Sequence, residues 1–271
     1  MNRPIRILWQ SSTNIERYPA YAKAIKARAN AILAPGNLLD VRGVPYGTSL
    51  LHFRAFDFLN NTEVFNSVVR AEHDGYDAVA IGCFLDPVLH EVREIMDIPV
   101  FSLAEAGMHV ACMYGQRFSV LNYSAPNNVK FVAELIERYG LEKRAAPSVA
   151  FALSFEQLEQ AMAGNPRECL DLVRAAARRA IAGGAEVILL GCGLLNLVCM
   201  QNGLHEVDGA PILDVSGVLM KLTESMVAIR RLTGLRPSRV GLYEKPSDAE
   251  INEVLAIYGR NFRKTEAEKP R

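Results

Sequence analysis

The sequence has no net charge and no long apolar run. Its 30 Lys and Arg residues balance 30 Asp and Glu residues, so it has no excess of positive charge to attract nucleic acid or an anionic membrane surface. No stretch approaches the roughly 18 to 20 consecutive apolar residues that cross a bilayer. The start, MNRPIRILWQ, lacks the apolar core and cleavage site of a signal peptide. We therefore expect a cytoplasmic protein that binds neither nucleic acid nor membrane.

Cysteine is scarce, and its spacing excludes the usual cysteine-based sites. The five cysteines are odd in number and too scattered for a CxxC metal pair, and a cytoplasmic protein is not expected to hold structural disulfides. The five histidines have no partner at metal-ligand spacing, so we expect no metal and interpret them as surface or core residues. By default each cysteine is a small buried apolar residue. The cysteines are Cys83, Cys112, Cys169, Cys192 and Cys199.

Short apolar runs alternate with longer amphipathic stretches along the chain. This alternation is typical of parallel strands buried under helices on both faces. The predicted strands are 6–9, 38–42, 78–81, 100–102, 118–121, 148–151, 187–190 and 212–214. The predicted helices are 15–33, 62–72, 87–96, 127–139, 167–182 and 217–233. The pattern indicates an α/β fold with doubly wound parallel sheets.

An internal repeat divides the chain into two similar halves. The corresponding segments are 5–14 with 118–127, 77–83 with 186–192, and 98–101 with 210–213, at offsets of 113, 109 and 112 residues. Two pseudo-symmetric halves of about a hundred residues each fit normal domain size. We predict a first half made of residues 1–113 plus 216–271 and a second half of 114–215, with the active site in the cleft between them. A short helix is expected near 248–258, followed by a charged, frayed end at 263–271.

Each half contains a glycine and a cysteine where a predicted strand ends. Gly82 and Cys83 follow one strand, and Gly191 and Cys192 follow its repeat. Ligands of open α/β sheets bind outside the carboxyl ends of strands, so both cysteines are candidate site residues. We expect each glycine to let the backbone turn sharply and to leave room for a substrate. The other three cysteines lack this placement and are interpreted as packing residues.

The residues after Cys83 favour an ionised thiol. Asp86 is a plausible N-cap and Pro87 suits the first position of a helix, so the thiol should lie just before a helix N-terminus. The positive end of the helix dipole should lower the thiol pKa towards neutrality. Pseudo-symmetry places Cys192 opposite Cys83. Two acid/base groups on opposite faces of one carbon can invert its configuration, because one removes a proton and the other returns one.

Polar loops after the first strand and its repeat are candidate substrate contacts. One loop holds Ser11, Ser12, Thr13 and Asn14, and the other holds Asn122, Tyr123 and Ser124. These side chains can hydrogen-bond a small substrate or can cap the helices that follow. The full predicted set of substrate-binding residues is Ser11, Ser12, Asn14, Gly82, Phe84, Asn122, Tyr123, Gly193 and Leu194.

The sequence resembles the Asp/Glu/hydantoin racemase superfamily, and within it the hydantoin racemase branch. The similar stretches are AIGCFLDP at 80–87, DIPV at 97–100, EAGMHVA at 105–111, RFSV at 117–120 and GAEVILLGC at 184–192. This resemblance implies two α/β halves, no cofactor and proton transfer by two thiols at a carbon next to a carbonyl. Cys83 and Cys192 match the two catalytic positions. We also expect a homo-oligomer.

The loops beside the thiols depart from that branch. Hydantoin racemases typically have Asn-Pro-Asn-Thr where this chain has Ser-Ser-Thr-Asn at 11–14. They follow the second cysteine with Ala-Gly-Met or Ser-Gly-Met, where this chain has Gly-Leu-Leu at 193–195. These positions shape the substrate site, so the resemblance predicts the chemistry better than the substrate, which we expect to be hydantoin-like or derived from an amino acid.

Two other functions fit the same sequence. A decarboxylase or cis-trans isomerase of the same superfamily would use one thiol as proton donor or nucleophile, although decarboxylases typically keep only one of the two cysteines. A non-catalytic small-molecule binding protein would use the cleft without any proton exchange. The presence of both Gly-Cys motifs favours racemisation.

Overall fold

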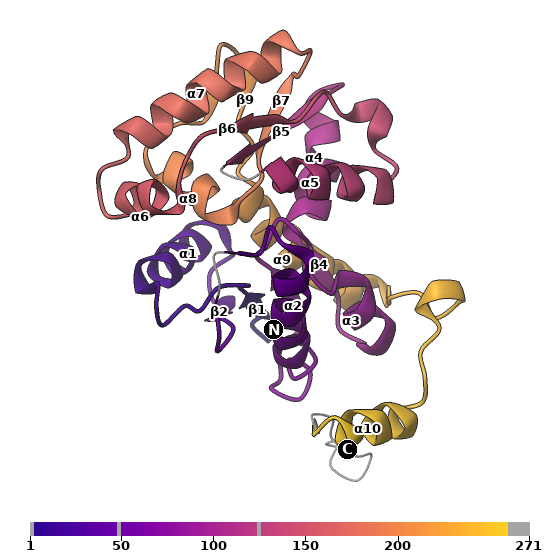
Figure 1. Ribbon diagram of the computed structural model, residues 1–271. Coiled ribbons are helices and arrows are strands. Elements are labelled where there is room, and N and C mark those ends of the chain that lie inside the picture. Colours follow the sequence, from indigo (N-terminus) through magenta and orange to yellow (C-terminus); the bar gives the residue numbers. More distant parts are fainter. Residues whose placement is uncertain (1–2, 48–49, 124–125, 260–271) are drawn as a thin grey trace.

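The computed structural model describes residues 3–47, 50–123 and 126–259, and its strands and helices alternate along the chain (Figure 1). The strands are β1 (Arg6–Gln10), β2 (Leu38–Arg42), β3 (Ala78–Ile81), β4 (Val100–Ser102), β5 (Phe118–Tyr123), β6 (Val149–Phe151), β7 (Val187–Leu190), β8 (Glu206–Val207) and β9 (Ala210–Pro211). The helices are α1 (Pro19–Ile32), α2 (Arg54–Val68), α3 (Leu89–Ile95), α4 (Leu103–Tyr114), α5 (Pro126–Arg138), α6 (Phe155–Met162), α7 (Arg167–Ala182), α8 (Gly193–Gln201), α9 (Val215–Thr233) and α10 (Asp248–Ile257). The 3₁₀ helices η1 (Glu142–Arg144) and η2 (Gly241–Tyr243) complete the elements.

Two parallel sheets with matching strand orders confirm the predicted α/β fold. The first sheet has the order β2-β1-β3-β4, and the second has the order β6-β5-β7. The second sheet also has a parallel bridge between Ile188 and Ile212, at the position that β4 occupies in the first. The predicted strand at 212–214 is wrong beyond this bridge, because Asp214 is already the N-cap of α9. Residues 210–211 pair with β8 in an antiparallel hairpin that the sequence did not predict.

Several helix boundaries differ from the predicted ones. Helix α1 begins at Pro19, a residue that suits the first turn because it needs no N–H partner there. Helix α2 begins at Arg54, eight residues before the predicted start at position 62. Helix α3 begins at Leu89 because Val88 adopts a left-handed conformation, with φ of 51°, that interrupts the helix.

The glycine hydrogen bonds correct the register of the repeat. The Gly82 N–H donates to the Gln10 carbonyl, and the Gly191 N–H donates to the Leu121 carbonyl, each at 2.8–2.9 Å. Gln10 and Leu121 are therefore equivalent, two residues away from the register that the sequence comparison predicted. It follows that Ser12 and Tyr123 occupy equivalent positions in the two halves.

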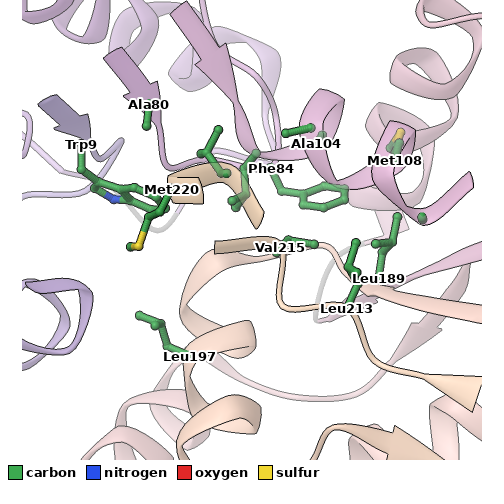
Figure 2. Close-up of a cluster of buried hydrophobic side chains, with 14 of the residues drawn as sticks. Trp9, Ala80, Phe84, Ala104, Met108, Leu189, Leu197, Leu213, Val215 and Met220 are labelled. Atoms are coloured by element: carbon green, nitrogen blue, oxygen red, sulfur yellow. The ribbon is translucent and has the colours of Figure 1, made fainter. Parts of the chain in front are cut away.

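One of three apolar clusters contains residues of both halves. Trp9, Ala80 and Phe84 from the first half and Leu189 and Leu213 from the second belong to one cluster of buried side chains (Figure 2). Helix α9 follows the second sheet in sequence but packs on α1, α4 and β3. This packing is what a returning last helix requires, and the exact domain boundaries stay a prediction.

After α9 the chain passes along α3, where Tyr243 of η2 hydrogen-bonds His90 and Lys245 pairs with Asp97. Helix α10 agrees with the predicted short helix near 248–258, and it lies at the end of an extended connection (Figure 1). The charged end predicted at 263–271 lies outside the described residues. Among the residues that the structure describes, no helix combines the length and the apolar character that a membrane crossing requires.

Candidate active site

A cavity of about 490 Å³ opens where the carboxyl ends of the two sheets face each other. Both Gly-Cys motifs line it, Cys83 from the loop after β3 and Cys192 from the end of the loop after β7. Nearly all of the predicted site residues line this one cavity. They are Ser11, Ser12, Gly82, Cys83, Phe84, Asn122, Tyr123, Cys192, Gly193 and Leu194.

Asn14 is the predicted substrate contact that does not line the cavity. Its side-chain carbonyl accepts hydrogen bonds from the N–H groups of Glu16 and Arg17, and its amide donates to the Pro45 carbonyl. These local bonds stabilise the turn before α1, whose N-cap is Tyr18, so Asn14 does not cap the helix itself. Ser124, in the second polar loop, lies outside the described residues.

The glycine before each cysteine is required by packing. A Cβ atom on Gly82 would lie 2.3 Å from the Trp9 ring, and one on Gly191 would lie 2.3 Å from the Asn122 Oδ1 atom. Both values are far below normal contact distances. Neither glycine has a positive φ, but the chain bends at Gly191 and both glycines line the cavity. The room for a substrate that the sequence predicts beside them stays a prediction.

The two Gly-Cys loops approach each other across the interface of the halves. A Cβ atom on Gly193 would lie 3.5 Å from the Gly82 carbonyl oxygen. The phenol of Tyr21 lies close enough to both thiols for each of them to raise its pKa, although burial is the main cause that raises this pKa to about 12. The Trp9 Nε1–H group donates to the Tyr21 hydroxyl over 3.2 Å. The two thiols and Tyr21 thus line the same cavity.

The Cys83 thiol is more difficult to ionise than the sequence predicted. Burial raises its pKa to about 12, and the Ser12 hydroxyl and the Leu85 N–H group oppose this shift. The expected helix dipole is missing here, because α3 begins six residues after Cys83 rather than at Pro87. The prediction of a lowered pKa for Cys83 is therefore wrong, and the thiol is the resting form.

Asp86 caps a different helix from the predicted one. Its carboxylate accepts hydrogen bonds from the Ala104 and Glu105 N–H groups, at 2.8 and 2.7 Å, in the first turn of α4. The Tyr139 hydroxyl also donates to it, over 2.5 Å. Burial raises the pKa of Asp86 to about 6, with these donors and Ser102 opposing the shift. Asp86 therefore fixes the Cys83 loop to α4.

The Cys192 thiol has the helix position that was expected for Cys83. Cys192 is the N-cap of α8, so the helix begins at the next residue. Burial raises the pKa of its thiol, while the Leu195 N–H, the Tyr123 hydroxyl and the Leu194 N–H oppose the shift. The Tyr123 oxygen lies 3.7 Å from the sulfur. These three groups and the positive end of a helix dipole offset part of the effect of burial, and the pKa of the Cys192 thiol stays above its ordinary value.

Two buried polar atoms beside the thiols lack protein partners. Ser12 Oγ lies near the Cys83 thiol, and neither it nor Asn122 Nδ2 has a partner at full hydrogen-bond distance within the described part of the chain. Buried polar groups are normally paired, because an unpaired one costs about 1–3 kcal/mol. Both residues line the cavity, so a polar ligand can supply the missing bonds.

The sequence did not single out several residues that line the cavity. Tyr18 at the start of α1 and Phe155 at the start of α6 meet edge to face, with ring centroids 5.6 Å apart, and so connect the two halves at the rim. Arg17 adds a cation to the lining, and His52, interpreted from sequence as surface or core, lies there as well. Nothing in the local sequence separates these residues from ordinary helix-terminal residues. Their role depends on long-range packing.

The remaining cysteines and the acidic residues do not form a further centre. Cys169 and Cys199 are buried in the core of the second half, and Cys112 packs against the shared core, as predicted. Within residues 3–47, 50–123 and 126–259, no three His, Cys, Asp or Glu side chains gather in a group that could hold a metal ion. The groups that line the cavity and can take part in chemistry are the two thiols, their hydroxyl and amide neighbours, and the side chains of Arg17 and His52.

Comparison with known proteins agrees with this geometry. The family model described as Asp/Glu/Hydantoin racemase matches residues 14–223. A hydantoin racemase of Pseudomonas sp. (strain NS671) is 30% identical over 76% of this chain and 78% of its own length, and one of Paenarthrobacter aurescens is 27% identical over 85% and 94%. The allantoin racemase structure from Klebsiella pneumoniae superposes with a TM-score of 0.76 at 27% identity, covering 90% of this chain and 94% of that one. These similarities support racemase activity, and the chain belongs to the Asp/Glu/hydantoin racemase family.

Proposed function

We propose that this chain racemises a small compound whose stereocentre lies next to a carbonyl, with Cys83 and Cys192 as the two acid/base groups. The observation that carries the proposal is that one thiol from each half lines the same cavity. A binding protein has no need for two thiols there, and a decarboxylase needs only one proton donor. The paired arrangement therefore favours inversion over the alternatives.

In the proposed reaction one cysteine acts as thiolate and the other as thiol. The thiolate takes the α-proton from one face of the substrate carbon, and the bonding electrons move onto the neighbouring carbonyl oxygen to form an enolate. The other thiol then delivers its proton to the opposite face and becomes the thiolate. The product has inverted configuration, and the enzyme is ready for the reverse direction with the roles exchanged.

The enolate needs hydrogen-bond donors that are in place before the reaction. Asn122 Nδ2 is a buried donor at the cavity without a protein partner, and the Ser12 hydroxyl is a second polar group of this kind. Preorganised donors aimed at developing negative charge are a major source of catalysis. We assign the Asn122 amide to the enolate oxygen, and the oxygen of the Ser12 hydroxyl, which lies beside Cys83, to a substrate N–H group. Gly193, Leu194 and Phe84 would shape the apolar side of the site.

The proposed substrate is a hydantoin or a related cyclic or open ureide. The ring of such a compound combines an activated α-carbon with carbonyl and N–H groups, which match the unpaired donor and acceptor groups of Asn122 and Ser12. The similarity to hydantoin and allantoin racemases supports this class. We further propose that the reaction requires no cofactor and that the enzyme is a cytoplasmic homo-oligomer.

A single assay tests this function. Each pure enantiomer of 5-substituted hydantoins, allantoin and free amino acids would be incubated with the protein in deuterium oxide. Chiral chromatography would follow inversion, and mass spectrometry would follow deuterium uptake at the α-carbon. We expect inversion with uptake of one deuterium for at least one ureide. Binding without any exchange across the panel would contradict the proposal and favour a binding protein.

A further inference from the structure

The charged side chains around the active-site cavity are unbalanced. Among the described residues that line the cavity, Arg17 is the single arginine or lysine, and none is an aspartate or glutamate. Glu16, the acid next to Arg17 in the sequence, does not line the cavity. The lining therefore has a net positive charge while both cysteines are thiols, whether or not His52 is protonated.

The Arg17 guanidinium is not used by the protein itself. Within the part of the chain that the structure describes, it takes part in no hydrogen bond and no ion pair. Arg28 on α1 shows the contrast, because its guanidinium pairs with Asp214. An arginine presents a planar fork of N–H donors that matches the two oxygens of a carboxylate. Arg17 thus has all of these donors free for a ligand.

Arg17 also does not act on the reacting groups. The main causes that set the pKa of the Cys83 and Cys192 thiols are burial, nearby hydroxyl and backbone N–H groups and, for Cys83, two carboxylates. A guanidinium in contact with a thiol would be prominent among these causes, because a neighbouring positive charge favours the thiolate. Arg17 therefore serves a part of the substrate that lies away from the α-carbon.

The rim beside Arg17 suits the stem of a side chain on the substrate. Tyr18 follows Arg17 directly, and its ring meets that of Phe155 edge to face at the rim of the cavity. The cavity of about 490 Å³ falls within the roughly 300–1,000 Å³ that hold drug-sized ligands, so it is larger than a bare five-membered ring requires. Methylene groups attached to such a ring can pack on the two aromatic side chains and carry a terminal group to Arg17.

Building on the proposed racemase function, we propose that Arg17 binds a carboxylate at the end of the substituent on the substrate's α-carbon. The preferred substrates are then hydantoins or related ureides with an acidic side chain. Such a substrate needs a cation in the cavity, because one of the two cysteines is a thiolate during the proposed reaction and would repel an anion. Arg17 offsets this repulsion and makes the cavity selective for the acidic class.

Hydantoins that differ only in charge test this proposal. The single enantiomers of 5-(carboxymethyl)hydantoin and 5-(2-carboxyethyl)hydantoin are each compared with the carboxamide of the same shape, and steady-state inversion gives kcat and KM. We expect the wild type to have a KM about tenfold lower for at least one acid than for its carboxamide, as a hydrogen-bonded ion pair provides. The kcat values should be similar, because a contact remote from the α-carbon binds substrate and transition state equally. Added sodium chloride should reduce the preference, because salt screens an exposed ion pair.

The Arg17→Gln variant tests whether this residue causes the preference. Arg17 is exposed, so the substitution should not disturb folding, and the difference in KM between acid and carboxamide should disappear. The matched control is Lys26→Gln, which removes a positive charge from an exposed position of α1 that does not line the cavity. The control should keep the wild-type preference for the acid.

The outcomes separate this inference from the proposed function on which it rests. Equal KM values for acid and carboxamide in the wild type would overturn the role of Arg17, while inversion of either compound would still support a racemase. A preference that Arg17→Gln keeps, or that Lys26→Gln loses as well, would also overturn that role. If the wild type inverts no ureide at all, acidic or neutral, the proposed function fails and this inference fails with it.

Discussion

The two halves hold their cysteines at equivalent strand ends but surround them differently. Cys192 is the N-cap of α8, and two backbone N–H groups and the Tyr123 hydroxyl favour its thiolate. Cys83 is followed by an irregular turn in which Asp86 and Val88 have positive φ, and one N–H group and the Ser12 hydroxyl favour its thiolate. The repeat thus places the two sulfurs symmetrically without giving them the same electrostatic surroundings.

The two thiols share one feature of their surroundings, a hydroxyl group beside each. Ser12 and Tyr123 are equivalent residues in the corrected register, and each places a hydroxyl beside the thiol of its own half. Ser12 lies in the loop after β1, whereas Tyr123 is the last residue of β5. In the proposed reaction each hydroxyl can stabilise the thiolate of its own half.

Removing either thiol should have the largest effect. Cys83→Ser and Cys192→Ser should each reduce racemisation by about 10²- to 10⁴-fold, the usual contribution of an acid/base group, because a serine hydroxyl is a much weaker acid than a thiol. Steady-state inversion rates measure the loss. Cys112→Ser is the matched control, since Cys112 is a half-buried packing residue on α4. Equal activity in the control and in either test variant would contradict the assigned roles.

Removing the hydroxyl group beside either thiol, with Ser12→Ala or Tyr123→Phe, should have the next largest effect on the racemisation rate. Burial raises the pKa of both thiols, so the thiolate fraction and the racemisation rate should rise with pH. Without a donor the thiolate is less stable, and the rise should move to higher pH. Hydrogen bonds to charged groups contribute about 1.5–3 kcal/mol, so we expect a rate loss of about tenfold or more near pH 8.

The Ser12→Ala and Tyr123→Phe variants should shift the pH–rate profile by different amounts. Ser12→Ala leaves Cys83 with one backbone donor, whereas Tyr123→Phe leaves Cys192 with two and a helix N-terminus. The pH–rate profile of Ser12→Ala should therefore shift further than that of Tyr123→Phe. Unshifted profiles in both variants would show that these hydroxyls do not act on the thiols.

Alanine at the two glycines should affect stability to different degrees. A Cβ at position 82 meets the fully buried Trp9 indole, which cannot move without disturbing the core, so Gly82→Ala should cost about 1–3 kcal/mol. At position 191 the nearest atoms belong to the Asn122 amide, which is more easily displaced, so the cost should be smaller. Urea denaturation measures both, and the reverse order would contradict this account of the packing.

Removing the carboxylates that cap α4 and α9 should have the smallest effect on the unfolding free energy. Helix α4 is capped from a distance by Asp86, whereas α9, its counterpart, is capped by the adjacent Asp214, which also pairs with Arg28. Loss of an acidic N-cap typically costs about 1 kcal/mol, so Asp86→Ala and Asp214→Ala should each lower the unfolding free energy by about that amount. Only Asp86→Ala should also lower racemisation, because Asp86 fixes the Cys83 loop. Equal activity in the two variants would argue against that link.

The sequence predicts the strands β1 to β7 and the placement of both Gly-Cys motifs at strand ends, because buried parallel strands appear as short apolar runs. The sequence does not predict features that depend on contacts between residues far apart in the chain. Asp86 precedes a proline and therefore suggests a local cap, but its carboxylate reaches α4 instead. The left-handed Val88 leaves no mark in the sequence. The cavity residues Tyr21 and Phe155 come from helices far apart in the chain, so only the packed structure brings them beside the thiols.

The most direct test of the two-thiol reaction is deuterium uptake from solvent by each substrate enantiomer in the single cysteine variants. Each variant keeps one thiol, on one face of the substrate carbon. Our account predicts that Cys83→Ser and Cys192→Ser no longer invert the substrate, and that each still exchanges the α-proton of one enantiomer only, with opposite preferences. Exchange of the same enantiomer by both variants, or inversion at the wild-type rate by either, would contradict the account.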